Sequence, residues 1–476
     1  MLILSVLQIE KKSIREGNLQ YEQIHVINPP LQLNIPKDKI RSMNDRTPIG
    51  ITNWRNNKQP FYVKDADRLG HIYVIGKTGV GKSTLLLNMA ISDIQNGKGL
   101  CIIDPHGDIA ETILDYVPQE RLEDIIYFNP KDLEYPIAFN PLKGVHPNYH
   151  HLVASGLIST FKKIWADSWG PRLEYILRFS LLTLLEYPDA TLLDIQPLLT
   201  DMFFRNRVLS YVTNQHTLSF WKNEYDKYSP SLRSESITPI LNKTGVFLTS
   251  IPLRNIVGQK TRGFAMQEVL DEGKILIANL SKGEIGEDAS CLLGSILVTS
   301  IQLAALYRSI QKEHERIPFY LYVDEMHSFV SLSFVDILAE ARKYKLSLFL
   351  THQYIEQIHE KIRAAIFGNV GTLISFRIGA ADAECLAKEF HPIFNEDDLI
   401  NLPRYSMYLK LMIDGATSKP FSAMTLPLQL KTDSLKEKVI DLSRKKYGKE
   451  RAVVEKSIFD RHQKPAEENK ERGLFD

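Results

Sequence analysis

The sequence predicts an α/β fold with a mainly parallel central sheet, an inserted all-α domain and a small β-rich N-terminal region. Short apolar runs rich in β-branched residues recur along the chain, a pattern typical of strands buried on both faces of a parallel sheet. Segments with helical periodicity separate these runs. Residues 145–270 show no strand-like alternation of any length, so an all-helical insertion is expected there.

Length and composition indicate a globular protein with several domains. The chain has 476 residues, 44% hydrophobic and 24% charged, and single cores rarely grow past roughly 250–300 residues. The formal net charge is only +1, so contact with nucleic acid would require local basic patches. The expected regions are a β-rich subdomain (1–60), the first part of the sheet domain (61–144), the all-α insertion (145–270), the second part of the sheet domain (271–430) and a charged helical or disordered tail (431–476).

Cysteine usage and hydropathy favour a cytoplasmic location, with any membrane attachment made through partners. Cys101, Cys291 and Cys385 are isolated in sequence, which fits reduced thiols and offers no zinc spacing. The N-terminus lacks a basic region before its apolar start and lacks a small-residue cleavage site, so no signal peptide is expected. Cys291 to Tyr307 comes closest to a membrane span, but its small and polar residues favour a buried helix.

Residues 1–60 alternate apolar and polar positions in short runs that prolines interrupt. The runs are Leu2–Ile9, Tyr21–Ile27 and Leu31–Ile35. They predict strands of a small subdomain or of a sheet edge.

The clearest motif follows a short apolar run, His71–Ile75, and reads G-x-x-x-x-G-K-S from Gly76 to Ser83. Leu85–Ile94 then has helical periodicity, so strand, glycine loop and helix come in the order that a phosphate-binding loop requires. Inward-turned N–H groups and the positive end of the helix dipole make such a loop a socket for phosphate. The residues expected to bind the nucleotide are Gly76, Lys77, Thr78, Gly79, Val80, Gly81, Lys82, Ser83 and Thr84.

Two side chains of this loop have specific expected roles. We expect Lys82 to reach the β- and γ-phosphates of ATP and to take part in catalysis. We expect the Ser83 hydroxyl to ligate Mg²⁺.

A second buried run, Leu100–Ile103, ends in the residues DPHGD, from Asp104 to Asp108. If this strand lies beside the phosphate loop, Asp104 stands where open α/β sheets bind ligands. It would then contact Mg²⁺-bound water near the nucleotide or position a base. The alternative is a turn and cap before the helix Ile109–Tyr116, a role that suits Asp108 better than Asp104.

The all-helical block carries many basic side chains among acidic ones. They are either a solvated charged surface or, in part, a track for nucleic-acid phosphates. The basic residues are Lys162, Lys163, Arg172, Arg205, Arg207, Lys222, Arg233, Lys243, Arg254, Lys260 and Arg262.

The sheet pattern begins before the insertion and resumes after it. Besides the two runs already described, the expected strands are Ile125–Phe128, Gly273–Leu280, Phe319–Val323, Leu346–Leu350 and Gly371–Phe376.

Two carboxylates follow directly on the strand Phe319–Val323, in the pattern of a Walker B motif. The end of the strand would bring Asp324 to the Mg²⁺ ion as a ligand, while Glu325 would accept a proton from the attacking water. A surface acidic pair is the alternative.

Polar residues also follow the next two strands. Gln353 is expected to sense the γ-phosphate and to take part in catalysis, whereas His352 is either structural or catalytic. Arg377 has two open interpretations: it pairs with Asp382 or Glu384, or it reaches a neighbouring subunit's nucleotide as a catalytic arginine finger.

Beyond Leu430 the chain is rich in charged residues and poor in apolar ones. It predicts a charged helix followed by a disordered tail from Gln463 to Asp476.

With these elements placed, the sequence resembles the FtsK/HerA superfamily of ATP-driven translocases, and within it the coupling proteins of conjugative and type IV secretion systems. The resemblance implies a RecA-like P-loop NTPase core that uses ATP and Mg²⁺, and an all-α domain near the entrance of a hexameric ring whose pore holds nucleic acid. It carries over firmly to Lys82, Ser83, Asp324 and Glu325. The passages that carry it are HIYVIGKTGVGKSTLL, GLCIIDPHGD, DSWGPRLEYILR, KILIANLSKGEIGEDASCLLGSIL, FYLYVDEMHSF and LISFRIGAADAECLAKEF.

Three functions remain open at this point. The first is a homo-hexameric ring motor that hydrolyses ATP to move DNA, with a relaxase, a nuclease or a membrane secretion complex as a further partner. The second is a type IV secretion ATPase that acts on protein partners without gripping DNA. A nucleotide-gated scaffold with slow turnover is disfavoured, because both Asp324 and Glu325 are present. Membrane coupling proteins usually begin with transmembrane helices; none is expected here, which puts membrane anchoring in doubt and leaves room for a soluble motor that is recruited by a partner or acts within a mobile element or a defence system.

Overall fold

A computed structural model describes residues 45–53, 58–332, 334–429, 431 and 433–462. The expected strands Leu2–Ile9, Tyr21–Ile27 and Leu31–Ile35 lie outside these residues, as does the expected tail Gln463–Asp476, so these stay predictions.

The described residues form one large central sheet of 11 strands, in the order β2-β1-β13-β10-β9-β3-β8-β7-β4-β6-β5. From β9 to β5 all neighbours are parallel, whereas β10, β13, β1 and β2 extend the sheet as an antiparallel edge. The strands are β1 (Arg46–Thr52), β2 (Pro60–Lys64), β3 (Ile72–Ile75), β4 (Gly99–Asp104), β5 (Ile125–Phe128), β6 (Ile275–Asn279), β7 (Phe319–Val323), β8 (Leu346–His352), β9 (Thr372–Ser375), β10 (Ser406–Lys410) and β13 (Phe421–Thr425). A separate hairpin pairs β11 (Met412–Ile413) with β12 (Ala416–Thr417).

The α/β fold class with its mainly parallel sheet is confirmed. Every strand predicted between His71 and Phe376 is present in the parallel part, and no bound is shifted by more than two residues. The antiparallel strands β10 and β13 were not predicted. Their residues mix buried and exposed positions, so they lack the continuous apolar run of a central strand.

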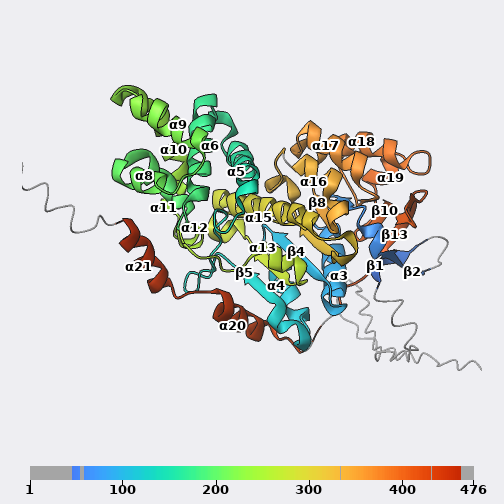
Figure 1. The fold of residues 1–476 in the computed structure, drawn as a ribbon. Helices are drawn as coiled ribbons and strands as arrows, with labels where there is room; N and C mark the ends of the chain where they lie inside the picture. Colours follow the sequence, from blue (N-terminus) through green and yellow to red (C-terminus); the bar gives the residue numbers. More distant parts are fainter. Residues whose placement is uncertain (1–44, 54–57, 333, 430, 432, 463–476) are drawn as a thin grey trace, which may run out of the picture. The chain divides into compact units, whose positions relative to one another are not determined.

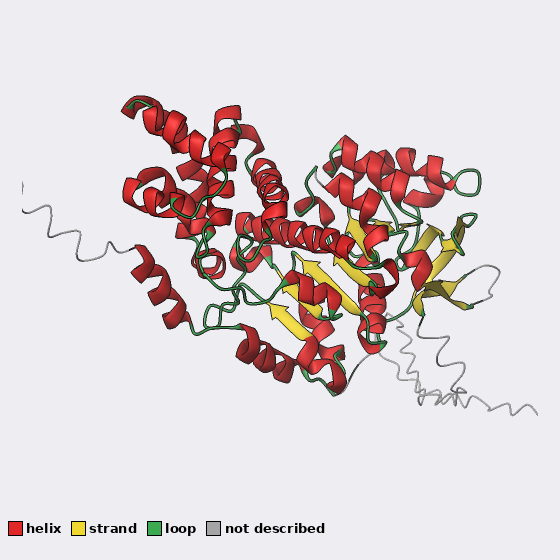
Figure 2. Cartoon of the chain, viewed as in Figure 1, coloured by secondary structure: helices red, strands yellow, loops and turns green. Residues whose placement is uncertain are grey.

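Alternating side chains place two hydrophobic cores on the two faces of the sheet. In β3, Ile72 and Val74 join the core under α3 and α4, while Tyr73 and Ile75 join the core that contains α5 and α15. This is the period-2 geometry of a strand buried on both faces. Figure 2 shows helices flanking the strands on both sides.

The sheet domain contains α2 (Asp65–Arg68), α3 (Lys82–Gln95), α4 (Asp108–Ile113), α14 (Lys282–Ile285), α15 (Glu287–Tyr307), α16 (Phe334–Glu340), α17 (Glu360–Asn369), α18 (Ala380–Phe390) and α19 (Glu396–Ile400). Between β5 and β6 the described residues form helices and loops but no strand (Figure 1), apart from a single β-bridge between Ile137 and Gly448. These helices are α5 (His150–Ile164), α6 (Pro171–Glu186), α7 (Ile195–Thr200), α8 (Met202–Leu209), α9 (Gln215–Ser219), α10 (Pro230–Thr244), α11 (Val246–Thr249), α12 (Ile251–Val257) and α13 (Met266–Asp271).

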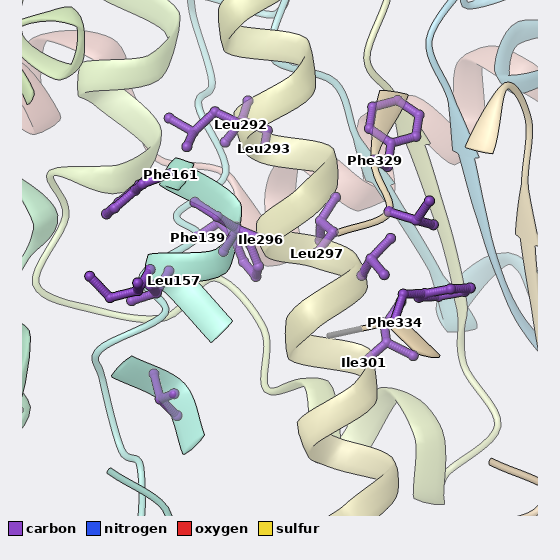
Figure 3. Close-up of a cluster of buried hydrophobic side chains, with 14 of the residues drawn as sticks. Phe139, Leu157, Phe161, Leu292, Leu293, Ile296, Leu297, Ile301, Phe329 and Phe334 are labelled. Atoms are coloured by element: carbon purple, nitrogen blue, oxygen red, sulfur yellow. The ribbon is translucent and has the colours of Figure 1, made fainter. Parts of the chain in front are cut away.

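The long helix α15 packs α5 on one side and the segment after β7 on the other. Figure 3 shows Leu157 and Phe161 of α5 on one flank of α15, and Phe329 and Phe334 on the opposite flank. Glu287–Ile310 is the one helix in the described part of the chain with the length and hydropathy of a membrane span. Because 72% of its most apolar 18-residue stretch is buried inside the protein, we describe it as a core helix.

Two helices follow the sheet at the C-terminal side, where the sequence predicted one. The first, α20 (Lys436–Tyr447), lies beside the edge strand β5, and Ser443 Oγ accepts a hydrogen bond of 2.9 Å from the backbone N–H of Tyr127. The second, α21 (Arg451–His462), lies on the helical block, where Arg461 pairs with the buried Asp194.

Candidate nucleotide site

The phosphate loop lies between β3 and α3, as the sequence predicted. Gly79 and Gly81 have φ angles of 73° and 126°, a region that side chains with a Cβ rarely adopt. Val80 is buried and anchors the loop, whereas Ser83 in the first turn of α3 is exposed. The N-terminal N–H groups of α3 and the Ser83 hydroxyl therefore face outward from a well-anchored loop.

Lys82 is folded over the loop. Its Nζ donates hydrogen bonds to the carbonyl oxygens of Gly76 at 2.6 Å and Lys77 at 3.1 Å. Burial lowers the pKa of Lys82, and the negative charges of Glu325 and Asp324 oppose that lowering. The ammonium group thus lies near both carboxylates that follow β7.

Asp324 and Glu325 are both buried at the end of β7, with 4% and 5% of their surface exposed. The hydroxyl of Thr351, at the end of β8, donates a hydrogen bond to Asp324 Oδ1. Burial raises the pKa of Asp324 to about 6, while the Thr351 hydrogen bond acts in the opposite direction. The alternative of a surface acidic pair is wrong, since neither carboxylate lies on the surface.

Glu325 has a backbone conformation that few residues other than glycine adopt. Its φ of 47° and ψ of 55° lie in the left-handed region, which costs a non-glycine residue about 1–3 kcal/mol. Strain of this kind persists where surrounding contacts enforce it, and it is concentrated at functional sites.

Gln353 connects the phosphate loop to Glu325. Its Nε2 donates a hydrogen bond of 2.7 Å to Glu325 Oε1, and its Oε1 accepts one of 3.0 Å from the hydroxyl of Thr78. The other carboxylate oxygen, Glu325 Oε2, is buried and has no hydrogen-bond partner among the described residues. That oxygen lies 3.5 Å from Nδ1 of His327, so one acceptor of Glu325 remains available.

His352, next to Gln353, is a structural residue. Its side chain is buried, and Nδ1 lies 3.0 Å from the hydroxyl of Tyr73. Burial lowers the pKa of His352 to about 3, so the imidazole stays neutral in the interior of the sheet.

The strand order corrects one premise of the expectation for Asp104. Strands β7 and β8 separate β4 from β3, so Asp104 does not follow the strand beside the phosphate loop. Its carboxylate accepts hydrogen bonds from the backbone N–H groups of His106 at 2.9 Å and Ala110 at 3.0 Å. Asp104 thus stabilises the turn and the start of α4, the capping role that the sequence assigned to Asp108.

Arg377 lies beside the phosphate loop of its own chain. Its carbonyl oxygen accepts a hydrogen bond of 2.9 Å from the N–H of Lys77. The expected pairing with Asp382 or Glu384 is absent from the ion pairs of the described residues. The carboxylate of Asp382 instead accepts a hydrogen bond of 2.9 Å from the N–H of Ile355.

Three residues near the loop escaped the sequence analysis. Besides Thr351, these are Arg404 and Tyr405, which reach the loop from the turn before β10. Arg404 Nε donates to the Gly79 carbonyl at 3.0 Å, and the Tyr405 N–H donates to the Val80 carbonyl at 2.7 Å. No local motif marks Arg404 and Tyr405, since they approach the loop only through the antiparallel edge.

The site fits a nucleoside triphosphate with Mg²⁺. Groups of three or more His, Cys, Asp or Glu side chains that could hold a metal are absent from the described residues. Mg²⁺ does not need such a cage, because it usually takes one or two protein oxygens together with phosphates and water. The Ser83 hydroxyl and the Asp324 carboxylate provide oxygens of this kind, and Glu325 Oε2 offers an unused acceptor for a water molecule.

Comparison with known proteins agrees with this geometry. Residues 60–390 match the family model described as the type IV secretion-system coupling protein DNA-binding domain. No curated protein sequence matches the chain.

Solved structures share the fold at low sequence identity. The bacterial conjugative coupling protein TrwB, in an unbound form lacking its N-terminal segment, is 16% identical with a TM-score of 0.57, over 82% of this chain and 92% of that one. TrwB in complex with ADP and Mg²⁺ is 16% identical with a TM-score of 0.56, over 84% and 95%. VirB4 of Thermoanaerobacter pseudethanolicus is 15% identical with a TM-score of 0.54, over 80% and 96%. Because the family model covers more than half of the chain, this protein belongs to the type IV secretion-system coupling-protein family and is a P-loop NTPase.

Proposed function

We propose that this protein is an ATP-hydrolysing motor that assembles into a homo-hexameric ring and translocates DNA. The observation that carries the proposal is the hydrogen-bonded series Thr78, Gln353 and Glu325. It joins the phosphate loop to a carboxylate with an unused acceptor, an arrangement suited to repeated turnover rather than to a static nucleotide-gated scaffold.

Each residue has a distinct part in the proposed reaction. Glu325 Oε2 would accept a proton from the attacking water, while Gln353 orients the carboxylate through Oε1. Lys82 would exchange its bonds with the loop carbonyls for bonds to the phosphates, and Ser83 and Asp324 would hold Mg²⁺. Bound Mg²⁺ would supply charge neutralisation on the phosphate oxygens.

DNA as the transported polymer is supported by the family, whose model is described as a DNA-binding domain. The basic side chains of the helical block are the proposed contacts. The proposed contacts leave out the side chains that are already engaged within the chain: among these, Lys162 pairs with Glu174, Arg205 with Asp226 and Lys260 with Asp189, and Lys163 donates to a backbone carbonyl. Binding to phosphates releases counterions and weakens steeply with salt.

The test is steady-state ATP hydrolysis without DNA, with single-stranded DNA and with double-stranded DNA, each at low and moderate salt. We expect one form of DNA to stimulate hydrolysis, more strongly at low salt, and the Lys82→Ala protein to show background turnover. Wild-type hydrolysis that equals this background would refute the ATPase. Turnover that is real but identical under all three conditions would favour the alternative, a type IV secretion ATPase acting on protein partners.

A further inference from the structure

The turn that follows Glu325 is held from two helices outside the phosphate loop. This turn, Met326–Ser328, is a single 3₁₀ turn. Lys163, in the last turn of α5, donates from Nζ to the His327 carbonyl at 2.8 Å. Lys282, the first residue of α14, donates from Nζ to the Ser328 hydroxyl at 2.9 Å.

The same turn determines what lies next to the unused oxygen of Glu325. The backbone N–H of Ser328 donates to the Glu325 carbonyl at 2.9 Å, so the turn and the strained residue are one unit. The His327 ring lies 3.5 Å from Glu325 Oε2. A shift of the His327 backbone therefore changes the surroundings of the oxygen proposed to accept the proton.

If stability of the fold were the only requirement, lysine would be an unfavourable residue at position 163. It forms no ion pair within the described residues, and the partner of its Nζ is a neutral carbonyl. Burial lowers the pKa of Lys163 to about 7; the nearby Lys282 acts in the same direction and the Cys291 thiol acts against it. A methionine would fill this space without desolvating an amine, which points to a use for the hydrogen bond.

The packing around α15 links the two ends of this contact. Phe161, two residues before Lys163, packs into the core that α15 shares with Phe329, two residues after His327 (Figure 3). A Cβ at Gly294 of α15 would lie 2.2 Å from the Phe329 ring. Close-packed interiors transmit displacement because they have little free volume. A shift of α5 would therefore displace the turn after Glu325 as well.

We propose that Lys163 is a positioning residue for hydrolysis, which ties the His327–Ser328 turn to α5 and thereby makes the setting of Glu325 depend on the position of the helical block. The proposal rests on the proposed ATPase function and deepens it, since it names a route by which a polymer or partner engaged by the helical block controls the site.

The test compares Lys163→Met, which removes the donor, with Lys163→Arg, which keeps a donor and a charge. We expect Lys163→Met to lower kcat about tenfold to hundredfold, because small misplacements of reacting groups have effects of this size, while KM for ATP stays within about twofold. Lys163→Arg should recover most of kcat. The matched control is Lys162→Met, since the neighbouring Lys162 is largely exposed and contacts only Glu174 at 3.5 Å.

A second readout does not depend on activity. Hydrogen–deuterium exchange of a peptide spanning residues 324–329 should be faster in Lys163→Met than in wild type or Lys162→Met, with no nucleotide added. If Lys163→Met fails to fold, Lys163→Leu repeats both measurements; loss of folding in both variants would assign Lys163 to stability and overturn the proposal.

The possible outcomes distinguish the proposed ATPase activity from the proposed positioning role of Lys163. Wild-type turnover no higher than that of Lys82→Ala refutes the ATPase itself. An active wild type with unchanged kcat and unchanged exchange in Lys163→Met refutes only the positioning role.

Discussion

Glu325 has one carboxylate oxygen bound to Gln353 and one without a hydrogen-bond partner in the described residues. A Glu325→Gln substitution keeps an acceptor for Gln353 but removes the basic oxygen, so we expect kcat for ATP hydrolysis to fall by about 10²–10⁴, the usual contribution of a general base. Binding of a fluorescent ATP analogue should be retained. Hydrolysis at the wild-type rate would show that Glu325 is not the base.

Lys163 allows a pH prediction with a definite sign. Its pKa is lowered from 10.5 to about 7 by burial, with Lys282 of α14, Cys291 of α15 and the turn at His327 packed around it. Between these two values the unfolded chain binds more protons at this site than the folded protein, so wild-type stability gains from a rise in pH across this window.

Lys163→Met lacks that gain. We therefore expect its Tm, relative to wild type, to be highest near pH 7 and to decline as the pH approaches about 9.5. Thermal unfolding at the two pH values measures this difference, with Lys162→Met as the control that shows no such trend. A pH-independent difference would mean that Lys163 is not desolvated.

The sequence predicted individual site residues well where a motif ties them to a strand end. Asp324 and Glu325 follow β7 directly, and the loop with Lys82 follows β3, so parallel pairing brings them to one edge of the sheet. Asp104 also ends a strand, but which strands are neighbours depends on long-range pairing that no local pattern reveals. The premise that its strand lies beside the phosphate-loop strand was wrong for that reason, while its expected role near the nucleotide stays a prediction.

At the scale of elements, α15 depends on a close approach to the segment after β7. Gly294→Ala would normally stabilise a helix by about 1 kcal/mol, yet here the new methyl group would meet the ring of Phe329, which is 1% exposed. Overpacking of this kind costs about 1–3 kcal/mol. We expect a lower urea midpoint for Gly294→Ala, measured by circular dichroism.

Gly368 in α17 provides the matched control, because nothing lies within 4 Å of a Cβ built there. Gly368→Ala should leave the urea midpoint unchanged or raise it. Equal effects of the two substitutions would show that Phe329 moves aside freely, and the tight link between α15 and the turn after Glu325 would then be lost.

The elements that the sequence revealed are those with strong local patterns. Buried parallel strands such as β5 and β7 read as continuous apolar runs, and their bounds match the structure. Strand β10 is stabilised by pairing with β9 and β13, and β13 also pairs with β1. The exposed positions of both strands resemble a loop. Arg404 and Tyr405 were missed together with them.

For the whole molecule, the two C-terminal helices lie against two different parts of the protein, the edge of the sheet and the helical block. Helix α20 is bonded to β5 through Ser443, and α21 contacts the helical block through Glu455, whose Oε1 accepts a hydrogen bond of 3.2 Å from Asn255. The charged composition of this region predicted a single charged helix before the tail. Val439 and Val454 in these helices are nevertheless buried, whereas Val453 and Phe459 are exposed.

The proposed ring also leads to a test of where Arg377 acts. Its carbonyl is bonded to Lys77 of its own phosphate loop, and its side chain has no ion pair in the described residues. Because this backbone contact places the Arg377 side chain beside its own loop, we expect Arg377→Ala to lower kcat and to impair only the subunit that carries it.

Mixing the Arg377→Ala and Glu325→Gln proteins distinguishes this from action on a neighbour. If Arg377 served the adjacent subunit, an Arg377→Ala subunit with an intact Glu325 would be completed by a Glu325→Gln neighbour with an intact Arg377, and hydrolysis would rise above that of either variant alone. We expect no such rise, provided that native mass spectrometry shows mixed assemblies. Recovered hydrolysis in mixed assemblies would instead establish Arg377 as an arginine finger acting between subunits.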